Sequence, residues 1–344
     1  MNERYLLTSV TRISDLESHA FETASLPREQ WADADYVVGR IKGAPSNLYR
    51  LELANGRLMD VMEGTYVVGA LGKRTATLEA VGDWEEIGDD GVMQALTGAG
   101  LFGKVTSAAT WLGQMISLSY EGHVIRDGRK LSMSDFLRPV AAGEFSVPVI
   151  LLVGTSMSAG KTTTGRVIIH ELKRAGLRVA GAKLTGAGRY RDVLSFQDAG
   201  ADAIVDFVDA GLPSTVVSEE RFKEAMDYML ARVVESKPDV LVAEAGASPL
   251  EPYNGAAAME ALGANVCCTV LCASDPYAAL GVQTAFRIKP DLVTGPAANT
   301  DAGIELVSKL TGLEAINLLK ESSLPRLVTL LGECLPPGTL ETLP

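Results

Sequence analysis

The stretch Val149 to Thr164 reads VILLVGTSMSAGKTTT and indicates a strand, a glycine-rich turn and a helix in direct succession. The branched apolar run from Ile150 to Val153 is typical of a strand buried on both faces of a parallel sheet. The small residues from Gly154 to Gly160 let successive backbone N–H groups turn into one hollow, which the positive end of the next helix also faces. The sequence therefore predicts a phosphate site here.

Each part of this turn has an expected role. The loop amides should bind the phosphates, the Lys161 ammonium should contact the terminal phosphate, and the Thr162 hydroxyl should ligate Mg²⁺. The spacing from Gly154 to Gly160 is one residue longer than the common GxxxxGK pattern. The predicted phosphate site consists of Gly154, Thr155, Ser156, Met157, Ser158, Ala159, Gly160, Lys161, Thr162 and Thr163.

Composition limits the class of protein. With 344 residues, of which 47% are hydrophobic, the chain is long enough for two domains with separate cores. The formal net charge of -12 argues against non-specific binding to nucleic acid or to an anionic membrane. The N-terminus MNERYLLTSV lacks the features of a secretory leader, and no apolar run is long enough to cross a bilayer. We therefore expect a cytoplasmic protein.

The four cysteines follow neither a disulfide framework nor a metal-binding spacing. Cys267, Cys268 and Cys272 lie in one apolar, strand-like run, and Cys334 lies far along the chain. Small thiols are common in buried strands. We expect these side chains to pack as small hydrophobic groups in a reducing compartment rather than form a metal or redox site.

The first part of the chain reads as β-rich. From Ala34 to Ile125, short runs alternate with period two between glycine turns, and Asn55-Gly56 between two such runs is a strong hairpin signal. This pattern predicts a small barrel or sandwich, with residues 91–111 as a short helix and loop over one mouth. The run LRPVAAGEFSVP, with its two prolines, is the expected linker.

After the phosphate loop, strand-like and helical segments alternate, which predicts an α/β fold with a doubly wound, mostly parallel sheet. We divide the chain into a β-rich N-terminal domain over residues 1–137, a linker over 138–148 and a phosphate-binding domain over 149–344.

Polar residues that follow buried strands are the remaining site candidates, because ligands of an open parallel sheet bind outside the carboxyl ends of its strands. Lys183 ends the strand VAGAK, Asp198 lies in the following loop RDVLSFQDAGAD, and Glu244 ends the apolar run DVLVAE. Burying Glu244 without a cation or donors would be costly, which favours a functional role. With Thr162, the two carboxylates would ligate Mg²⁺, and Lys183 would bind a phosphoryl or carboxylate oxygen. A surface position for Lys183 and a helix cap at Asp198 are the alternatives.

Four segments resemble dethiobiotin synthetase and the P-loop NTPase superfamily around it. GTSMSAGKT is similar to the phosphate loop of that family, GAKLTGAG to its substrate-contacting lysine segment, SFQDA to its metal-binding aspartate segment, and AEAGASPLEP to its metal-binding glutamate segment. The resemblance implies these roles for Lys183, Asp198 and Glu244. Ala245 and Ser248 replace two glycines of the family pattern.

The resemblance carries two further implications and has one limit. GPAANT is similar to the base-recognising loop, which implies that Asn299 contacts the nucleotide base. The active site of dethiobiotin synthetase lies against a neighbouring subunit, which implies a homodimer. That enzyme has a single domain, so the β-rich first part has no counterpart in it, and biotin synthesis itself is not expected.

A second resemblance points elsewhere. GTSMSAGKTTT and the later ELKRAGLRVA are similar to a two-domain P-loop family that includes the D-glutamate N-acetyltransferases. In that family the loop is thought to receive the phosphates of acetyl-coenzyme A. The glycine-rich segments of its close members appear here only as the altered forms KLTGAG and EAGA.

Three functions are compatible with these features. The preferred one is an ATP-dependent, Mg²⁺-dependent ligase or kinase, in which Lys161 and Lys183 assist phosphoryl transfer to a small carboxylate or carbamate that an amine then attacks. The second is an N-acetyltransferase that binds acetyl-coenzyme A without Mg²⁺, with Asp198 and Glu244 as base and amine binder. The third is a nucleotide-switched binding or metal-delivery protein. None of the three involves nucleic acid or a membrane.

Overall fold

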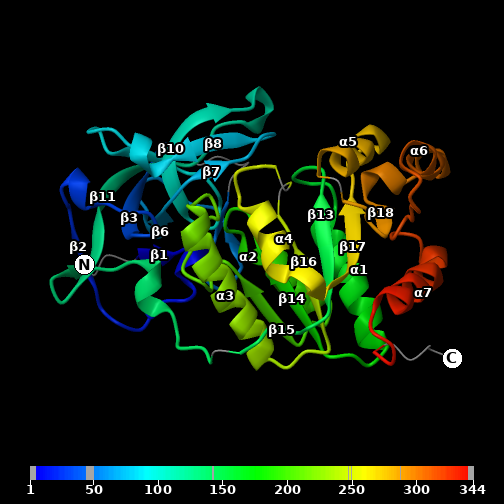
Figure 1. Cartoon of the computed structure of the whole chain (residues 1–344). Coiled ribbons are helices and arrows are strands. Elements are labelled where there is room, and N and C mark those ends of the chain that lie inside the picture. Colours follow the sequence, from blue (N-terminus) through cyan, green and yellow to red (C-terminus); the bar gives the residue numbers. More distant parts are fainter. Residues whose placement is uncertain are drawn as a thin grey trace. The chain divides into compact units, whose positions relative to one another are not determined.

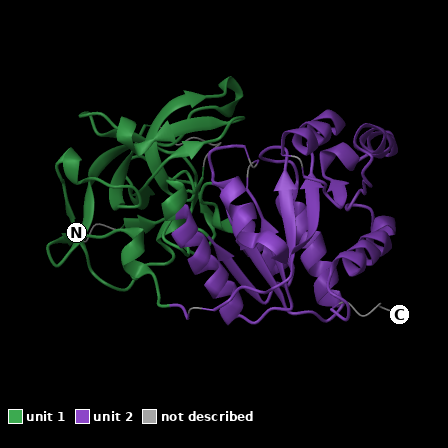
Figure 2. Ribbon diagram, viewed as in Figure 1, with its two compact units in different colours: residues 1–139, 187–191, 207–221 green, residues 140–186, 192–206, 222–344 purple. Residues whose placement is uncertain are grey.

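The protein forms two units, which a computed structural model describes over residues 5–43, 50–141, 143–246, 248, 250–286 and 288–339. Unit 1 contains residues 1–139, 187–191 and 207–221, and unit 2 contains residues 140–186, 192–206 and 222–344 (Figure 2). Across the described ranges, none of the helices combines the length and the apolar character that a membrane crossing requires.

Unit 1 is built on a closed ring of five strands, which confirms the predicted β-rich first part and makes it a barrel. In ring order the strands are β6 (Tyr66–Leu71), β3 (Tyr36–Lys42), β11 (Ser117–Arg126), β9 (Val92–Ala95) and β10 (Leu101–Ala108), and β10 pairs back with β6 in parallel. The shorter strands are β1 (Tyr5–Leu7), β2 (Glu22–Ala24), β4 (Leu51–Glu52), β5 (Leu58–Met59), β7 (Arg74–Thr75), β8 (Ala80–Asp83) and β12 (Arg129–Lys130). Short 3₁₀ helices cover Ser9–Thr11, Arg28–Gln30, Trp84–Glu86, Thr110–Leu112 and Met133–Phe136.

The expected hairpin at Asn55-Gly56 is present. Gly56 has a φ of 82°, and β4 pairs with β5 on either side of it. Leu48 and Tyr49, the first residues of the run LYRLELA that precedes this turn, lie outside the described residues. Of the two turn residues, Gly56 is the one that adopts the positive φ, and its N–H donates to the carbonyl of Leu53 at 2.7 Å.

The expected helix over residues 91–111 is wrong. This segment forms β9 and β10, which pair as an antiparallel hairpin with Ala95 opposite Phe102 in the barrel core. Its glycines mark the connecting turn, where Gly100 has a φ of 93° and an added Cβ would lie 2.0 Å from the hydroxyl oxygen of Thr8. The glycines and alanines of residues 91–111 suggest a helix and a loop. They are small because other parts of the chain, such as Thr8 beside Gly100, approach this backbone closely.

Unit 1 also contains two segments from much later in the chain. The buried carboxylate of Glu52 accepts hydrogen bonds from the backbone N–H groups of Tyr190 at 2.7 Å and Arg191 at 2.9 Å. Arg221 forms an ion pair with Asp33 at 2.7 Å. The late segments therefore provide polar partners for the early part of the same unit.

Unit 2 is an α/β fold with a fully parallel six-stranded sheet, which confirms the predicted fold class (Figure 1). The strand order is β15 (Ala203–Asp206), β14 (Val179–Lys183), β16 (Val240–Glu244), β13 (Val149–Gly154), β17 (Val266–Cys272) and β18 (Leu292–Thr294). The helices are α1 (Lys161–Arg174), α2 (Tyr190–Asp198), α3 (Glu219–Glu235), α4 (Gly255–Leu262), α5 (Pro276–Phe286), α6 (Asp301–Thr311) and α7 (Leu324–Cys334), of which α2 and α3 begin within the unit 1 segments 187–191 and 207–221. Short 3₁₀ helices cover Gly263–Asn265, Pro296–Ala298 and Glu321–Ser323.

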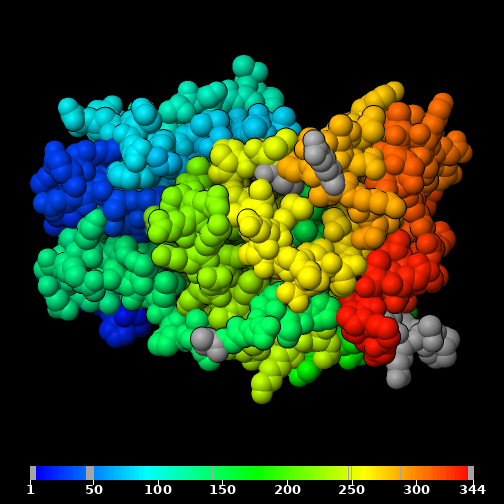
Figure 3. All heavy atoms as spheres, in the orientation of Figure 1, coloured from blue at the N-terminus to red at the C-terminus, as the bar shows by residue number. Residues whose placement is uncertain are grey.

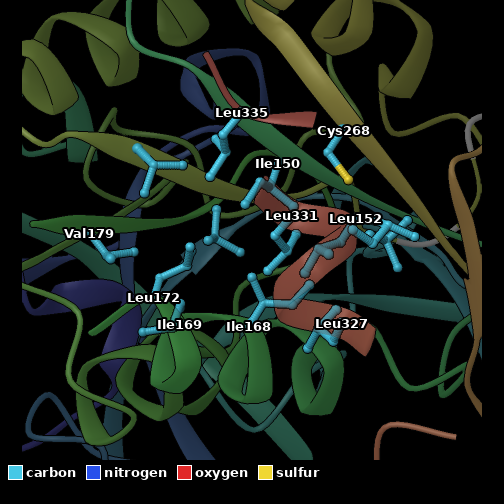
Figure 4. Packing of buried hydrophobic residues seen from close by; sticks show 14 of the residues in the cluster. Ile150, Leu152, Ile168, Ile169, Leu172, Val179, Cys268, Leu327, Leu331 and Leu335 are labelled. Atoms are coloured by element: carbon cyan, nitrogen blue, oxygen red, sulfur yellow. The ribbon is translucent and has the colours of Figure 1, made fainter. Parts of the chain in front are cut away.

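The central strand β13 is buried along its whole length, as its apolar run predicts. Ile150 and Leu152 point into a core with Ile168 of α1 and Leu331 of α7 (Figure 4). Alternate residues of a strand face opposite sides, so the residues between them pack toward the other face, where Figure 1 shows α3 and α4 in front of the sheet. Helices therefore cover both faces of the sheet around the strand that carries the phosphate loop.

Candidate functional site

The phosphate loop connects the carboxyl end of β13 to the first residue of α1. It reverses direction through two residues with positive φ, Ser158 at 62° and Gly160 at 97°. Thr155 ties the loop to the neighbouring strand β17, because its N–H donates to the carbonyl of Cys272 at 3.0 Å. The turn thus has a defined backbone, with the helix N-terminus directed at the same hollow.

Lys161 extends back along this loop. Its side chain is buried, with the residue 5% exposed, and its Nζ donates to the carbonyl of Ser156 at 2.8 Å. A Cβ added at Gly154 would lie 2.5 Å from that Nζ, closer than any normal contact. Glycine at position 154 is therefore what allows the ammonium group to lie against the loop where a phosphate would bind.

Substitution of that glycine gives a first prediction. In Gly154→Ala the new methyl group displaces the Lys161 ammonium, and we expect affinity for the phosphate-bearing ligand to fall about tenfold or more. Ligand-induced thermal shift measures the effect. The matched control is Gly281→Ala on α5, where an added Cβ meets nothing within 4 Å. Equal ligand shifts in both variants would contradict this role of Gly154.

Thr162 and Glu244 meet beside the loop. The Thr162 hydroxyl donates to Oε2 of Glu244 at 2.9 Å, and Glu244 is 4% exposed at the end of β16. The parallel register places Glu244 opposite Leu152 of β13, next to the start of the loop. Burial raises the pKa of Glu244 above its usual 4.5, against the opposing influence of the Lys183 and Lys161 charges. A further positive charge beside Glu244 would therefore favour its ionised form.

Three charged residues form a row across neighbouring strand ends. The register pairs Lys183 of β14 with Glu244 of β16 on one side and with Asp206 of β15 on the other. Lys183 is buried and its Nζ donates to the carboxylate of Asp192 on α2. Burial alone would lower the pKa of Lys183, but Asp192, Glu244 and Asp206 outweigh it and raise the pKa above 10.5. Lys183 is therefore a buried, fully charged ammonium rather than a surface lysine.

The loops that leave β14 and β16 lie in close contact. Leu184 N–H donates to the carbonyl of Glu244 at 2.9 Å, and the Thr185 hydroxyl donates to the carbonyl of Gly246 at 3.1 Å. A Cβ at Gly246 would lie 2.0 Å from the carbonyl oxygen of Thr185, so no larger residue fits. This packing fixes the two strand ends that carry Lys183 and Glu244. Two residues of the AEAGASPLEP segment, 247 and 249, lie outside the described residues.

The structure does not bring Asp198 to this group. Asp198 is the exposed last residue of α2, whereas Asp192 in the first turn of the same helix contacts Lys183. Six residues of helix separate them by about 9 Å along its axis. The sequence places Asp198 in a loop, but the helix continues through it and carries it away from the strand ends. Asp192 and Asp206 are members of this charged group that sequence reasoning missed, although Asp206 closes an apolar strand as Glu244 does.

Asn299 lies in the loop after β18. It follows the 3₁₀ turn Pro296–Ala298, its side chain is exposed, and its carbonyl accepts from Nδ2 of Asn317 at 3.1 Å. Gly295 at the start of this loop has a φ of 87°, and a Cβ there would lie 2.4 Å from the carbonyl oxygen of Ala159. The loop thus packs directly on the phosphate loop. Contact between Asn299 and a base remains a prediction.

These features define the class of protein. A buried strand leads into a glycine-rich turn and a helix that begins with Lys161 and Thr162, and a carboxylate from the adjacent strand bonds that threonine. Unit 2 therefore has the P-loop NTPase fold, and unit 1 is a separate β-rich part of the same chain.

No protein-family profile matches the chain, and no curated protein sequence is similar to it. Among solved structures, the chain is similar to chloroplast FtsY from Physcomitrella patens, with 16% identity and a TM-score of 0.35 over 53% of this chain and 62% of that one. It is similar to HypB from Helicobacter pylori in complex with nickel, with 16% identity and a TM-score of 0.38 over 58% of this chain and 92% of that one.

A third similar structure is a duf1611 family protein from Anabaena variabilis, with 16% identity and a TM-score of 0.37 over 57% of this chain and 61% of that one. The chain thus spans less than two thirds of the length of the FtsY and duf1611 structures that it matches. Likeness at these scores carries no argument about function.

Proposed function

We propose that the protein is an enzyme that binds ATP with Mg²⁺ at the P-loop and transfers its terminal phosphoryl group to a small carboxylate or carbamate, in a reaction of the ligase or kinase type. The observation that carries the proposal is the hydrogen bond from Thr162 to the buried Glu244, beside the buried ammonium of Lys161. Hydroxyl and carboxylate oxygens at a phosphate loop are the ligands that a hard divalent cation takes.

The residues at this position fit Mg²⁺. Thr162 and Glu244 would hold the ion directly or through its water molecules, and the raised pKa of Glu244 means that its ionised form gains from a nearby cation. When bound, the ion neutralises phosphate charge and orients the transferring group. Thr162 and Glu244 already lie 2.9 Å apart, so little rearrangement is needed to bring both oxygens to one ion.

The two buried lysines, Lys161 and Lys183, have different proposed roles. Lys161 lies on the loop and would bind the terminal phosphate as a point charge. Lys183 lies one strand beyond Glu244, where its ammonium, oriented by Asp192, would bind the acceptor carboxylate or the phosphoryl oxygens that gain charge during transfer. A site with two fixed ammonium groups suits an anionic acceptor, because their charges would offset repulsion between acceptor and phosphate.

An N-acetyltransferase that uses acetyl-coenzyme A is the alternative that the loop allows. It needs no divalent cation, so Thr162 and Glu244 would hold no ion, and Glu244 would instead act as the base or amine binder. A nucleotide-switched binding protein would use the same loop without an acceptor, and would leave the buried Lys183 beyond Glu244 without a partner in the reaction. Both functions thus account for fewer of the charged side chains at the strand ends.

Thermal-shift titration with ATP, GTP and acetyl-coenzyme A, each with and without Mg²⁺, tests the proposal. A ligand at a hundredfold its dissociation constant stabilises the folded state by about 2.7 kcal/mol. We expect a large shift with ATP that depends on Mg²⁺, followed by ADP formation that a mixture of small carboxylates accelerates. A Mg²⁺-independent shift with acetyl-coenzyme A alone would overturn the proposal in favour of acyl transfer. Light scattering on the same sample tests the expected homodimer.

The contact between Asp192 and Lys183 gives a further prediction. We expect Asp192→Asn to lower turnover about tenfold or more, because Lys183 loses the charged partner that orients it. Asp198→Asn, on the same helix, should change turnover less than twofold. The reverse result would restore the metal-ligand role that the sequence assigns to Asp198 and remove Asp192 from the site.

A further inference from the structure

Two thiols and one carboxylate from three separate elements of unit 2 come together away from the phosphate loop. Cys268 lies on β17, Asp291 directly precedes β18, and Cys334 is the last residue of α7. One ligand atom from each lies within 4.8 Å of the other two. Cys268 is buried and Asp291 is exposed, so the group runs from the core to the surface. We call these three residues the thiol cluster.

The thiol cluster lies at the amino ends of its strands, whereas the phosphate loop follows the carboxyl end of β13. Cys268 pairs with Ile150 near the start of β13, while Cys272 at the other end of β17 pairs with Gly154 of the loop. In a parallel sheet all amino ends of the strands lie on one side and all carboxyl ends on the opposite side. The thiol cluster is therefore separate from the proposed catalytic site.

Asp291 is held in a fixed orientation. Its Oδ2 accepts a hydrogen bond from the Thr269 N–H at 2.7 Å, and its own N–H donates to the carbonyl of Thr269 at 2.8 Å. These bonds join Asp291 to β17 one residue after Cys268. Carboxylates that bind metals are commonly held by such hydrogen bonds, which leave the second oxygen for the ion.

Cys334 is also on a well-anchored element. The leucines of α7 pack in the core with Cys268, as Figure 4 shows for Leu327, Leu331 and the adjoining Leu335. The outer side of the helix, red in Figure 3, lies at the surface. A thiol at the end of a helix packed in this way has a fixed position, which is what a binding site for an ion requires.

Cys267 supplies a further thiol beside the cluster. The pairing of β13 with β17 skips this residue, because Val149 pairs with Val266 and Ile150 pairs with Cys268. Cys267 packs against the same core as Cys334 and donates its S–H to the carbonyl of Val149 at 3.2 Å. The irregular register thus leaves Cys267 outside the regular pairing with β13, and its side chain packs against the core to which Cys268 belongs.

We propose that Cys268, Cys334 and Asp291 bind one Zn²⁺ ion, with Cys267 or a water molecule as the fourth ligand. Two thiolates and a carboxylate match the ligand preference of zinc, whose tetrahedral geometry places sulfur ligands about 3.7 Å apart given a Zn–S distance of about 2.3 Å. Atoms that lie within 4.8 Å of one another reach this geometry with small side-chain movements. The ion would tie the end of α7 to β17 and β18.

Titration of the reduced, chelator-treated full-length protein with Co²⁺ tests this site, because thiolate ligands give Co²⁺ an intense charge-transfer absorption. We expect this absorption to saturate at one equivalent and to disappear when Zn²⁺ is added. We also expect Zn²⁺ to raise the melting temperature, since metal binding to the folded state is linked to folding. A wild-type protein that gives no charge-transfer absorption would overturn the proposal.

Substitution of each proposed ligand tests whether the ion binds at the thiol cluster. Cys268→Ser and Cys334→Ser should each weaken Zn²⁺ binding by about 100-fold or more, while Asp291→Asn should weaken it about tenfold or more and keep the thiolate absorption. The control is Cys272→Ser, at the opposite end of β17, which should bind Co²⁺ as the wild type does. Because Asp291 is exposed, Asp291→Asn keeps the test decisive if a core cysteine variant fails to fold. Identical titrations for Cys334→Ser and the wild type would place any bound metal elsewhere.

Discussion

The variant Lys161→Ala is expected to lose the binding of its phosphate-bearing ligand. The Lys161 ammonium is buried and already lies on the loop at 2.8 Å from the carbonyl of Ser156, so it is the charge in direct contact with the phosphate position, whereas Lys183 lies beyond Glu244. Truncation of one partner in a buried, charged hydrogen-bonded pair costs about 2–5 kcal/mol. We therefore expect the dissociation constant for ATP with Mg²⁺ to rise about 100-fold or more.

Isothermal titration of the variant with ATP and Mg²⁺ measures this loss directly. Arg166→Ala is the matched control, because it removes one positive charge from an exposed position on the same helix and should change affinity less than about twofold. The melting temperature without ligand shows whether Lys161→Ala folds. A folded Lys161→Ala protein with unchanged affinity would remove the phosphate site from the loop and, with it, the proposed function.

The variant Glu244→Gln is expected to separate catalysis from binding. Glutamine keeps an oxygen that accepts from Thr162, so the loop should hold its shape, but the charge that attracts Mg²⁺ is lost. We expect Mg²⁺-dependent turnover to fall about 100-fold or more, while ATP affinity measured without Mg²⁺ changes less than about fivefold. Asp239→Asn, at the opposite end of β16, is the matched control and should leave turnover unchanged. Equal losses of turnover and of Mg²⁺-free affinity would count against a metal role.

Glu244→Gln has a second readout in the pH dependence of stability. Burial raises the pKa of Glu244 above 4.5, so above pH 4.5 the folded protein binds a proton that the unfolded chain has released. The free energy of unfolding contributed by this group therefore falls as pH rises from 4.5 through the raised pKa. The glutamine variant lacks this loss, so its melting temperature should decline less than that of the wild type as the pH rises above 4.5. Parallel curves would show that Glu244 does not titrate in this range.

The sequence predicts the strand, turn and helix around the phosphate loop, and the position of Glu244 at a strand end, because both signals are local. A strand, a turn of small residues and a helix follow one another within sixteen residues, and Glu244 stands out as a charge at the end of an apolar run. The fold class follows from the alternation of such runs. These features need no knowledge of what lies beside them in space.

The rest of the site depends on register and on helix length, which local patterns do not define. Asp206 joins the site only because β15 pairs with β14 so that Asp206 lies opposite Lys183. Asp192 joins it because α2 begins at Tyr190, and the same helix carries Asp198 away. The thiol cluster has the same origin, since Cys268 and Cys334 meet through packing of α7 on the sheet rather than through any spacing in the chain.

Unit 1 consists of three separate segments of the chain, which has a consequence for the order in which the protein folds during synthesis. The ribosome completes residues 1–139 early, but this unit also contains residues 187–191 and 207–221. Until those segments leave the ribosomal tunnel, the buried carboxylate of Glu52 lacks the two amides that it accepts from, and Asp33 lacks Arg221. The part that is synthesised first therefore cannot finish folding first, and a gene fragment that stops at residue 139 encodes an incomplete unit.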